Sequence, residues 1–566
     1  MKLTFFALIF PLIGFTQWDG NKTPTYPELI DIYKKWDVGH PEIELYQMGK
    51  SDTEFPIYLV ILNGAGDSLQ TFEKAKTKTT VLINNAIHAG EPDGVNACLL
   101  WIEEWIKKGK NTKELPVIAI IPAYNIGGML NRSASSRANQ DGPEEYGFRG
   151  NAQNLDLNRD FIKMDSKNMQ TFAKIYHALD PDVLVDTHVS NGADYQYTLT
   201  LIHSMKERMT PGMYHVFSQE YIPDLTKTLK KKGWDWSPYV ETREETPESG
   251  IQAFNDLPRY AQGYGSLFNT FSITVETHML KPFPQRVKAT KDYLDFLMHW
   301  SQVNSKEIES ARQQAKLESK QHASGIFRFN YQLADKKDSL LFKGYEFGYK
   351  PSEISGKERL FYDRSKPYAK YIPYYQTYLS HDSVRIPKGY IVSGEATAVI
   401  ERLKTNGVQF TEIEDRSIRK VHTIRILDFE SAAKPYEGHY LHRKVKSMEN
   451  EEEVNVPKGS IWIPCDQDKV NFILSVLEPR CEDSYFVWNF LDSYIQEKEY
   501  FSAYVFEDEA AKLLKENPSL REELEKKKTD DPEFAKSAEA QLFFVYQNSQ
   551  RFEKKTFNRL PIYKVY

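Results

Sequence analysis

The feature that most constrains this chain is a series of short, almost uninterrupted apolar runs separated by amphipathic helical stretches. Thr79–Asn84 is typical, because nearly every position between Thr79 and Ile83 suits a strand buried on both faces. The expected strands are Phe55–Leu62, Thr79–Asn84, Val117–Pro122, Val183–Asp186, Tyr195–Ile202 and Phe271–Glu276. The expected helices are Gly94–Lys107, Lys167–Leu179, Val216–Lys231 and Gln285–Trp300. This alternation predicts an α/β domain whose mixed, mainly parallel sheet has helices on both faces.

The length of the chain and a change of pattern predict more than one domain. A chain of 566 residues is enough for roughly two to four domains. We expect a catalytic domain over 18–304 and a highly charged helical connector over 305–325. After it the sequence becomes richer in Tyr, Val and Ile, with Pro-containing turns, so 326–566 is predicted to be a smaller α+β or β-rich accessory region.

The first residues indicate export. Lys2 precedes an uncharged apolar run, Leu3–Phe15, which is too short to span a bilayer easily and ends in polar sequence at Trp18. Residues 1–17 are therefore predicted to be a signal peptide and the protein to be secreted or periplasmic, the alternative being an uncut N-terminal anchor. No later stretch is apolar enough to predict a membrane span.

The net charge and the cysteine content bear on the kind of partner and on the redox state of the chain. The net charge is -6, which favours a small or peptide-like substrate over nucleic acid or an anionic membrane. There are three cysteines. Cys98 is expected to be a buried thiol, whereas Cys465 and Cys481 could pair in an oxidising compartment or remain free.

Four polar clusters follow predicted strands, where open α/β sheets bind their ligands. The first is His88-Ala89-Gly90-Glu91, which follows a buried strand and precedes a helix. An imidazole and a carboxylate at this spacing can meet at one metal ion, and zinc accepts both ligand types. By itself the pattern is also compatible with a polar turn carrying a solvated histidine.

The second cluster combines Asp156, Asn158 and Arg159 with Arg149, which stands nine residues before Asn158. An arginine beside an asparagine suits recognition of a carboxylate, because guanidinium binds carboxylate through two parallel hydrogen bonds. A salt-bridged loop is the alternative interpretation of this segment.

The third and fourth clusters end two further apolar strands. Asp186-Thr187-His188 follows Val183–Val185, and Glu276 ends the strand that begins at Phe271. His188 could supply a third metal ligand, although a histidine at a strand end is more often structural. A carboxylate such as Glu276 at the end of a buried strand needs a partner or a raised pKa, and either suits general acid–base chemistry. We expect His278 to be structural or to support a ligand from behind.

Taken together, the order His-x-x-Glu, Arg, Asp-x-Asn-Arg, His and a late-strand Glu resembles the carboxypeptidase A-like zinc metallopeptidase family. The resemblance covers about Tyr26 to Trp300, and the C-terminal half is similar to the extension of some large exported bacterial members. Two features depart from the family pattern. The usual Asn-Pro-Asp-Gly turn is replaced by Asn125-Ile126-Gly127-Gly128, and the substrate-capping tyrosine does not align cleanly.

The resemblance implies one Zn²⁺ ion and a role for each matching residue. His88, Glu91 and His188 would bind the zinc, and Asp156 would hydrogen-bond His88 from behind. Glu276 would act as the catalytic base and Arg149 would stabilise the oxyanion. The residues implied to bind substrate are Asn158 and Arg159, with Tyr260 as the nearest candidate for the capping tyrosine.

The resemblance thus predicts an exported metallocarboxypeptidase that hydrolyses C-terminal bonds in peptides with a free carboxylate. Two alternatives share this chemistry: an amidase or peptidase acting on murein stem peptides, and an N-acyl amino acid deacylase. A peptide-binding module or pseudoenzyme is the alternative from another class, and the presence of all three ligands and the glutamate argues against it.

Overall fold

The computed structural model describes residues 20–109, 115–321, 325–554 and 556–566. The predicted signal peptide, residues 1–17, lies outside the described residues. Within the described part of the chain, none of the helices combines the length and the apolarity that crossing a bilayer requires.

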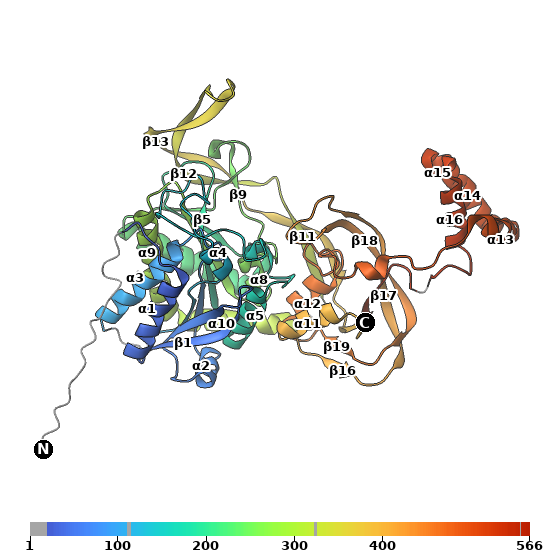
Figure 1. The fold of residues 1–566 in the computed structure, drawn as a ribbon, viewed down its shortest axis with the longest axis horizontal. Helices are drawn as coiled ribbons and strands as arrows, with labels where there is room; N and C mark the ends of the chain where they lie inside the picture. The colour runs from blue at the N-terminus through green and yellow to red at the C-terminus, as the bar shows by residue number, and fades with distance from the viewer. Residues whose placement is uncertain (1–19, 110–114, 322–324, 555) are drawn as a thin grey trace, which may run out of the picture.

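The N-terminal half is built on one eight-stranded mixed sheet (Figure 1). Its order is β1 (Ile43–Lys50), β2 (Pro56–Leu62), β4 (Val117–Ile121), β3 (Thr80–Asn84), β5 (Val183–Ser190), β10 (Phe271–His278), β6 (Leu199–His203) and β7 (Trp236–Pro238). The central strands β4, β3, β5 and β10 are mutually parallel. β1 pairs antiparallel with β2, β2 with β4 and β6 with β10, whereas β7 is parallel to β6. The central strands are buried along their whole length apart from Glu276, as their apolar sequences predict.

Helices cover both faces of this sheet, which confirms the predicted fold class. α3 (Asp93–Lys107) packs with α9 (Phe283–Val303) on one face, and α5 (Lys167–Leu179) and α8 (Ala261–Ser266) cover the other. The remaining helices of this half are α1 (Tyr26–Gly39), α2 (Ser68–Ala75), α4 (Ile126–Leu130), α6 (Pro211–Val216) and α7 (Ile222–Lys231). α5 begins where the Ser166 hydroxyl accepts from the Met169 amide, and ends at Asp180 in a left-handed conformation.

One predicted strand was partly wrong. Tyr195–Ile202 was expected to be a strand throughout, but β6 begins at Leu199. The reason is tertiary: Tyr195 and Tyr197 are buried in a separate apolar cluster with Phe342, which belongs to a later hairpin. The segment that carries these two tyrosines therefore does not join the sheet, because its rings pack against residues far along the chain.

α10 (Ser305–Gln321) occupies the stretch predicted to be a connector, and it packs more closely than that prediction implied. Ile308, Arg312, Ala315 and Ser319 form a buried stripe. The guanidinium of Arg312 lies 2.5 Å from the Asp180 carboxylate and 3.3 Å from that of Asp182, at the amino end of β5. The helix is thus attached to the sheet by a buried ion pair as well as by apolar contacts.

The C-terminal half is rich in β-structure, as predicted. A long hairpin of β12 (Lys337–Pro351) and β13 (Glu358–Tyr375) forms one sheet with two short strands of the N-terminal half, β9 (Ile251–Gln252), which pairs with β13, and β8 (Glu241–Thr242), which pairs with β9. A separate two-stranded sheet is formed by β11 (Ile326–Leu333) and β14 (Tyr378–Arg385). A six-stranded sheet follows, in the order β16 (Thr411–Ile413), β19 (Ser460–Pro464), β15 (Gly389–Val392), β20 (Arg559–Val565), β17 (Ser417–Ser431) and β18 (His442–Val456). It is flanked by α11 (Thr397–Thr405) and α12 (Val470–Leu477).

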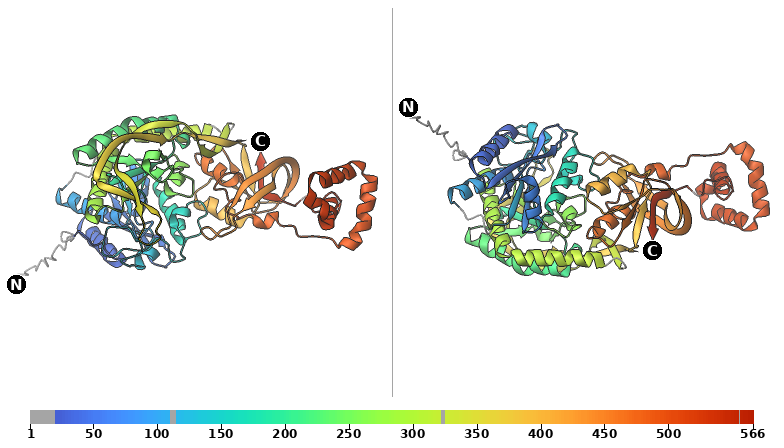
Figure 2. Two further views of the ribbon diagram at one scale, coloured as in Figure 1. Left: turned by 90° about the horizontal axis from the view of Figure 1, so that it is seen from above. Right: turned by 90° about the horizontal axis from the view of Figure 1, so that it is seen from below.

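A group of four helices with its own apolar core lies beyond this sheet at one end of the long axis (Figures 1 and 2). These helices are α13 (Ala503–Glu516), α14 (Pro518–Asp530), α15 (Pro532–Lys536) and α16 (Ala538–Gln547). Cys98, Cys465 and Cys481 are all buried free thiols, so the structure selects the unpaired alternative for the last two. The boundaries 18–304, 305–325 and 326–566 stay predictions.

Candidate metal centre and active site

The site lies at the carboxyl ends of three neighbouring parallel strands, β3, β5 and β10. In the register of β5 and β10, His188 is the direct partner of Glu276. Partners on adjacent strands project from the same face of a sheet, so these two side chains point to the same side. The loop that follows β3 supplies the remaining groups.

The loop after β3 is held in a compact turn that brings His88 and Glu91 together. Ala86 takes a left-handed conformation with φ 58°, and the Glu91 amide donates to the His88 carbonyl at 2.9 Å. α3 then begins at Asp93, and Gly94 lies directly against β5. A Cβ atom on Gly94 would lie 2.1 Å from Oγ1 of Thr187, so only glycine allows this approach.

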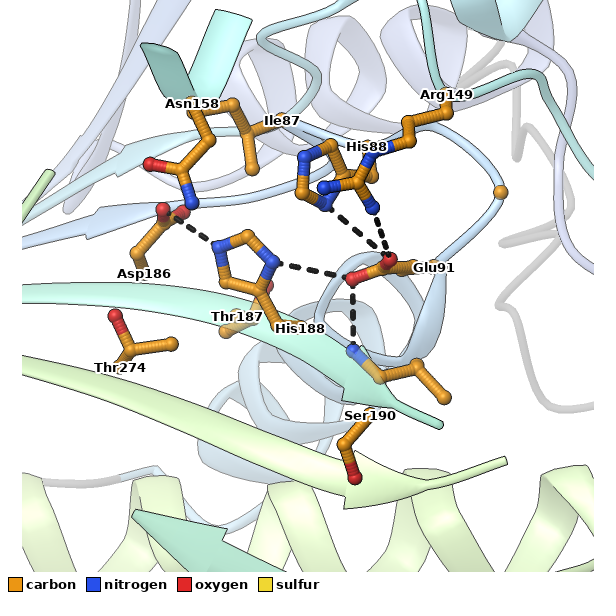
Figure 3. A network of polar contacts seen from close by, with 12 residues as sticks. Ile87, His88, Glu91, Arg149, Asn158, Asp186, Thr187, His188, Ser190 and Thr274 are labelled. Atoms are coloured by element: carbon orange, nitrogen blue, oxygen red, sulfur yellow. Dashed lines mark hydrogen bonds and ion pairs between the residues drawn. The ribbon is translucent and has the colours of Figure 1, made fainter. Parts of the chain in front are cut away.

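His88, Glu91 and His188 converge on one point (Figure 3). One ligand atom from each residue lies within 4.8 Å of the others, and the two imidazole ring centres are 4.9 Å apart. Nδ1 of His88 is 3.2 Å and Nδ1 of His188 is 3.1 Å from the Glu91 carboxylate. All three residues are buried. Two imidazoles and one carboxylate are a donor set that zinc accepts in catalytic sites.

The hydrogen bonds around the two imidazoles fit a metal ion between them. Nε2 of His88 lies 2.9 Å from Oδ1 of Asp156, and Nε2 of His188 lies 2.8 Å from Oδ2 of Asp186. A carboxylate on Nε2 keeps the proton there and leaves Nδ1 with a free lone pair. Nδ1 of His88 is buried and has no hydrogen-bond partner among the described residues, as expected for an atom that binds a metal.

The Glu91 carboxylate is oriented by its protein neighbours. Oε2 accepts from the Val189 amide at 2.8 Å, and Oε1 accepts from the Arg137 guanidinium at 2.5 Å. Burial opposes ionisation of Glu91, but Arg137 and His88 together hold its pKa well below its usual range. The pKa of His188, which burial would lower, is raised well above its usual value by Asp186 and Glu91.

Glu276 lines the same pocket as the three ligand candidates, and the volume of that pocket is about 420 Å³. Its carboxylate is partly buried at the end of β10. Burial raises the pKa of Glu276 to about 7, against the attraction of His188. A carboxylate with a pKa near 7 is suited to accepting and returning a proton.

The residues predicted to bind substrate surround this pocket, which is lined by Arg149, Asn158, Arg159 and Tyr260. Arg149 Nη2 lies 2.9 Å from the Asp156 carboxylate and Nη1 lies 3.6 Å from that of Glu91. The carbon at the centre of the Arg159 guanidinium is 4.6 Å from the centre of the Tyr260 ring. The Asn158 side chain accepts from the Ala261 amide at 3.2 Å.

The structure adds two residues near the metal centre that sequence reasoning did not assign. Asp186 is two positions from His188 on the same strand, and this spacing was a usable signal because alternate strand residues share a face. Arg137 lies in a loop, where side chains have no regular periodicity, so the sequence pattern did not indicate its role. His278, by contrast, lies outside the cluster and contacts the Ala193 carbonyl through Nε2 at 2.7 Å.

Comparison with known proteins finds similarity to carboxypeptidases. A family model described as zinc carboxypeptidase matches residues 31–358. Proteins named carboxypeptidase 2 from Trichophyton tonsurans and Trichophyton equinum are each 20% identical over 501 residues, covering 82% of this chain and 84% of the relative.

Solved structures with similarity to this chain include two carboxypeptidases. Carboxypeptidase A from Helicoverpa armigera is 14% identical with a TM-score of 0.36, and the match covers 52% of this chain and 74% of the other. A metallo-carboxypeptidase from Burkholderia cenocepacia is 17% identical with a TM-score of 0.34, and the match covers 48% of this chain and 68% of the other.

Proposed function

This chain belongs to the zinc carboxypeptidase family, and from that premise we propose that it is an exported enzyme that removes C-terminal residues from peptides. The observation that carries the proposal is the convergence in one pocket of a ligand triad, a carboxylate base and an Asn-Arg pair. The triad suits zinc, the base suits hydrolysis, and the Asn-Arg pair suits a free carboxylate.

His88, Glu91 and His188 would hold the zinc ion, with Asp156 and Asp186 fixing the two imidazoles. When bound, the ion supplies Lewis-acid polarisation of a water molecule and of the scissile carbonyl. Arg137 keeps Glu91 in the orientation that this set requires, because its two nitrogens bridge the Glu91 carboxylate and the Val189 carbonyl.

The remaining pocket residues divide the chemistry between them. Glu276 accepts a proton from the attacking water and returns it to the leaving amine. The Arg149 guanidinium stabilises negative charge that develops on the carbonyl oxygen. Asn158 and Arg159 bind the terminal carboxylate of the substrate, and Tyr260 lies against Arg159 where it can cover the bound residue.

Export is part of the proposal and is supported by the sequence of residues 1–17, with its single lysine and uncharged apolar run. A secreted or periplasmic enzyme of this kind would meet peptides outside the cytoplasm.

The test is a digest of a synthetic peptide library, with products identified by mass. We expect residues to be lost one at a time from the C-terminus, the loss to stop when a chelator removes the metal, and zinc to restore it. Peptides with an amidated C-terminus serve as the matched control and should be cleaved far more slowly. Internal cleavage, or equal rates on amidated and free peptides, would contradict the proposal.

A further inference from the structure

The turn between β17 and β18, in the C-terminal half, reaches the predicted substrate-carboxylate site. We call Tyr436–His439 the 436–439 turn. The Glu437 carboxylate accepts a hydrogen bond from the Asp156 amide at 2.6 Å. The Tyr436 hydroxyl accepts one from Nε of Arg159 at 3.0 Å. The two contacts join residues that are 281 and 277 positions apart in the sequence.

The 436–439 turn is a tight and rigid structure. The Tyr436 amide donates to the His439 carbonyl at 2.7 Å, and the His439 amide donates to the Tyr436 carbonyl at 3.0 Å. The two central residues, Glu437 and Gly438, both have positive φ, at 50° and 85°. Such a turn normally has Asn, Asp or Gly at its first central position, so a glutamate there is strained. Strain of this kind persists where the surrounding contacts fix the backbone, and it is concentrated at functional sites.

Side chains on either side of the central pair hold the turn in place. Nε2 of His439 lies 2.7 Å from the Asp165 carboxylate, and its Nδ1 lies 2.5 Å from the Asn489 side chain. The Tyr436 ring stacks on the indole of Trp488, with ring centres 6.3 Å apart and planes 25° apart. Tyr436 therefore presents its hydroxyl from a fixed position rather than from a mobile loop.

The contacts of Arg159 show what this fixed hydroxyl does. Nε donates to Tyr436, Nη1 donates to the Asn158 carbonyl at 2.9 Å, and the guanidinium lies over the Tyr260 ring. Arginine has five N–H donors in a rigid plane, so two hydrogen bonds and one ring contact fix the direction of that plane. Arg159 lines the pocket, and the same contacts therefore decide how it faces a ligand there.

We propose that Tyr436 and Glu437 are positioning residues for the substrate carboxylate, so that the C-terminal half completes the recognition site of the catalytic half. Tyr436 acts through the guanidinium of Arg159. Glu437 acts through the backbone at Asp156, the residue that precedes the short helical turn Leu157–Arg159. This inference rests on the proposed carboxypeptidase activity, and it assigns neither residue to the chemical step.

The first test is Tyr436→Phe in the full-length protein loaded with zinc. This change removes the hydroxyl and keeps the ring that stacks on Trp488. A hydrogen bond to a charged group is strong enough for its loss to raise KM about tenfold on a peptide with a free carboxylate. We expect kcat to change less than twofold, zinc content to stay the same, and KM on an amidated peptide to be unaffected. Tyr440→Phe is the matched control, because Tyr440 is half exposed in the same connection, and it should leave KM unchanged.

A double-mutant cycle with Arg159→Ala separates positioning from a general structural effect. If Tyr436 acts through Arg159, Tyr436→Phe adds no further rise in KM once Arg159 is alanine. The inference would be overturned if Tyr436→Phe raised KM equally with Arg159 intact and with alanine at position 159, or if it left KM unchanged in the protein that keeps Arg159. Failure of the proposed function is a different result, namely a wild-type protein that loads zinc and releases no C-terminal residue from any peptide.

Discussion

At the scale of single residues, the site depends on how carboxylates hold the groups that face the metal. Asp156 and Asp186 each bind Nε2 of one imidazole, so both Nδ1 atoms face Glu91. Such partners raise the basicity of the ligand and fix its ring, so removing them typically weakens metal binding 10–100-fold. The chain thus contains one supporting carboxylate for each histidine that we propose as a zinc ligand.

Glu276→Gln tests the assigned base at this scale. The amide keeps the shape of the side chain and cannot accept the proton of the attacking water, so we expect kcat to fall by a factor of about 10²–10⁴. Zinc content, measured by elemental analysis, should equal that of the wild type, because Glu276 is outside the ligand triad. A variant that binds zinc and keeps wild-type kcat would show that another group is the base.

Residue types and spacing were informative where the backbone is regular. His88 and Glu91 follow β3, and His188 and Glu276 lie near the carboxyl ends of β5 and β10, so the parallel sheet alone brings them to one edge. Tyr436 and Glu437 could not be found in this way. Their approach to Arg159 and Asp156 depends on a turn in the C-terminal half whose position is decided by packing on Trp488 and Asp165. No periodicity in the sequence encodes that contact.

At the scale of elements, the site depends on α3 lying close to β5 and being locked to α9. Gly94 allows the close approach, and the buried side chain of Arg286 on α9 binds Asp93, the first residue of α3, at 2.9 Å. Arg286 also donates to the carbonyls of Asp141, Lys281 and Gly142. The loop that carries His88 and Glu91 ends at this junction, so the ion pair supports the metal site indirectly.

Arg286→Ala is therefore expected to lower the free energy of unfolding by about 3–5 kcal/mol, because it leaves the Asp93 carboxylate buried without its charged partner. Lys288→Ala on the same helix is the matched control. The Lys288–Asp292 ion pair has a 63% exposed lysine side chain, and its loss should change the free energy by less than about 1 kcal/mol. Urea unfolding of both variants measures the difference. Equal values for the two would show that the buried ion pair has no special role.

The elements themselves were predictable to different degrees. β3, β4 and β10 and the helices α3, α5 and α9 lie within a few residues of their predicted bounds, because their apolar patterns are strong and local. β6 was mispredicted at its start, where tyrosines with high strand propensity pack on Phe342 instead. α10 looked like a solvated connector because its buried stripe is narrow and contains an arginine, whose partners Asp180 and Asp182 lie just before β5.

At the scale of the whole molecule, two bodies meet at the substrate side of the pocket. The catalytic half supplies the candidate ligand triad, the proposed base and the Asn-Arg pair, and the C-terminal half supplies the 436–439 turn behind them. The four-helix group at the far end of the long axis has a separate core and takes no part in these contacts (Figure 2). The C-terminal half, predicted to be an accessory region, thus contacts Asp156 and Arg159, at the site where substrate recognition is expected.

All the proposed chemistry requires that one zinc ion binds where His88, Glu91 and His188 converge. Anomalous diffraction from zinc-loaded crystals, recorded on both sides of the zinc absorption edge, tests it most directly. We expect one strong peak about 2.0–2.2 Å from Nδ1 of each histidine and from the Glu91 carboxylate, facing Glu276. A peak held by other residues, or one from which any of these three ligands is absent, would contradict it.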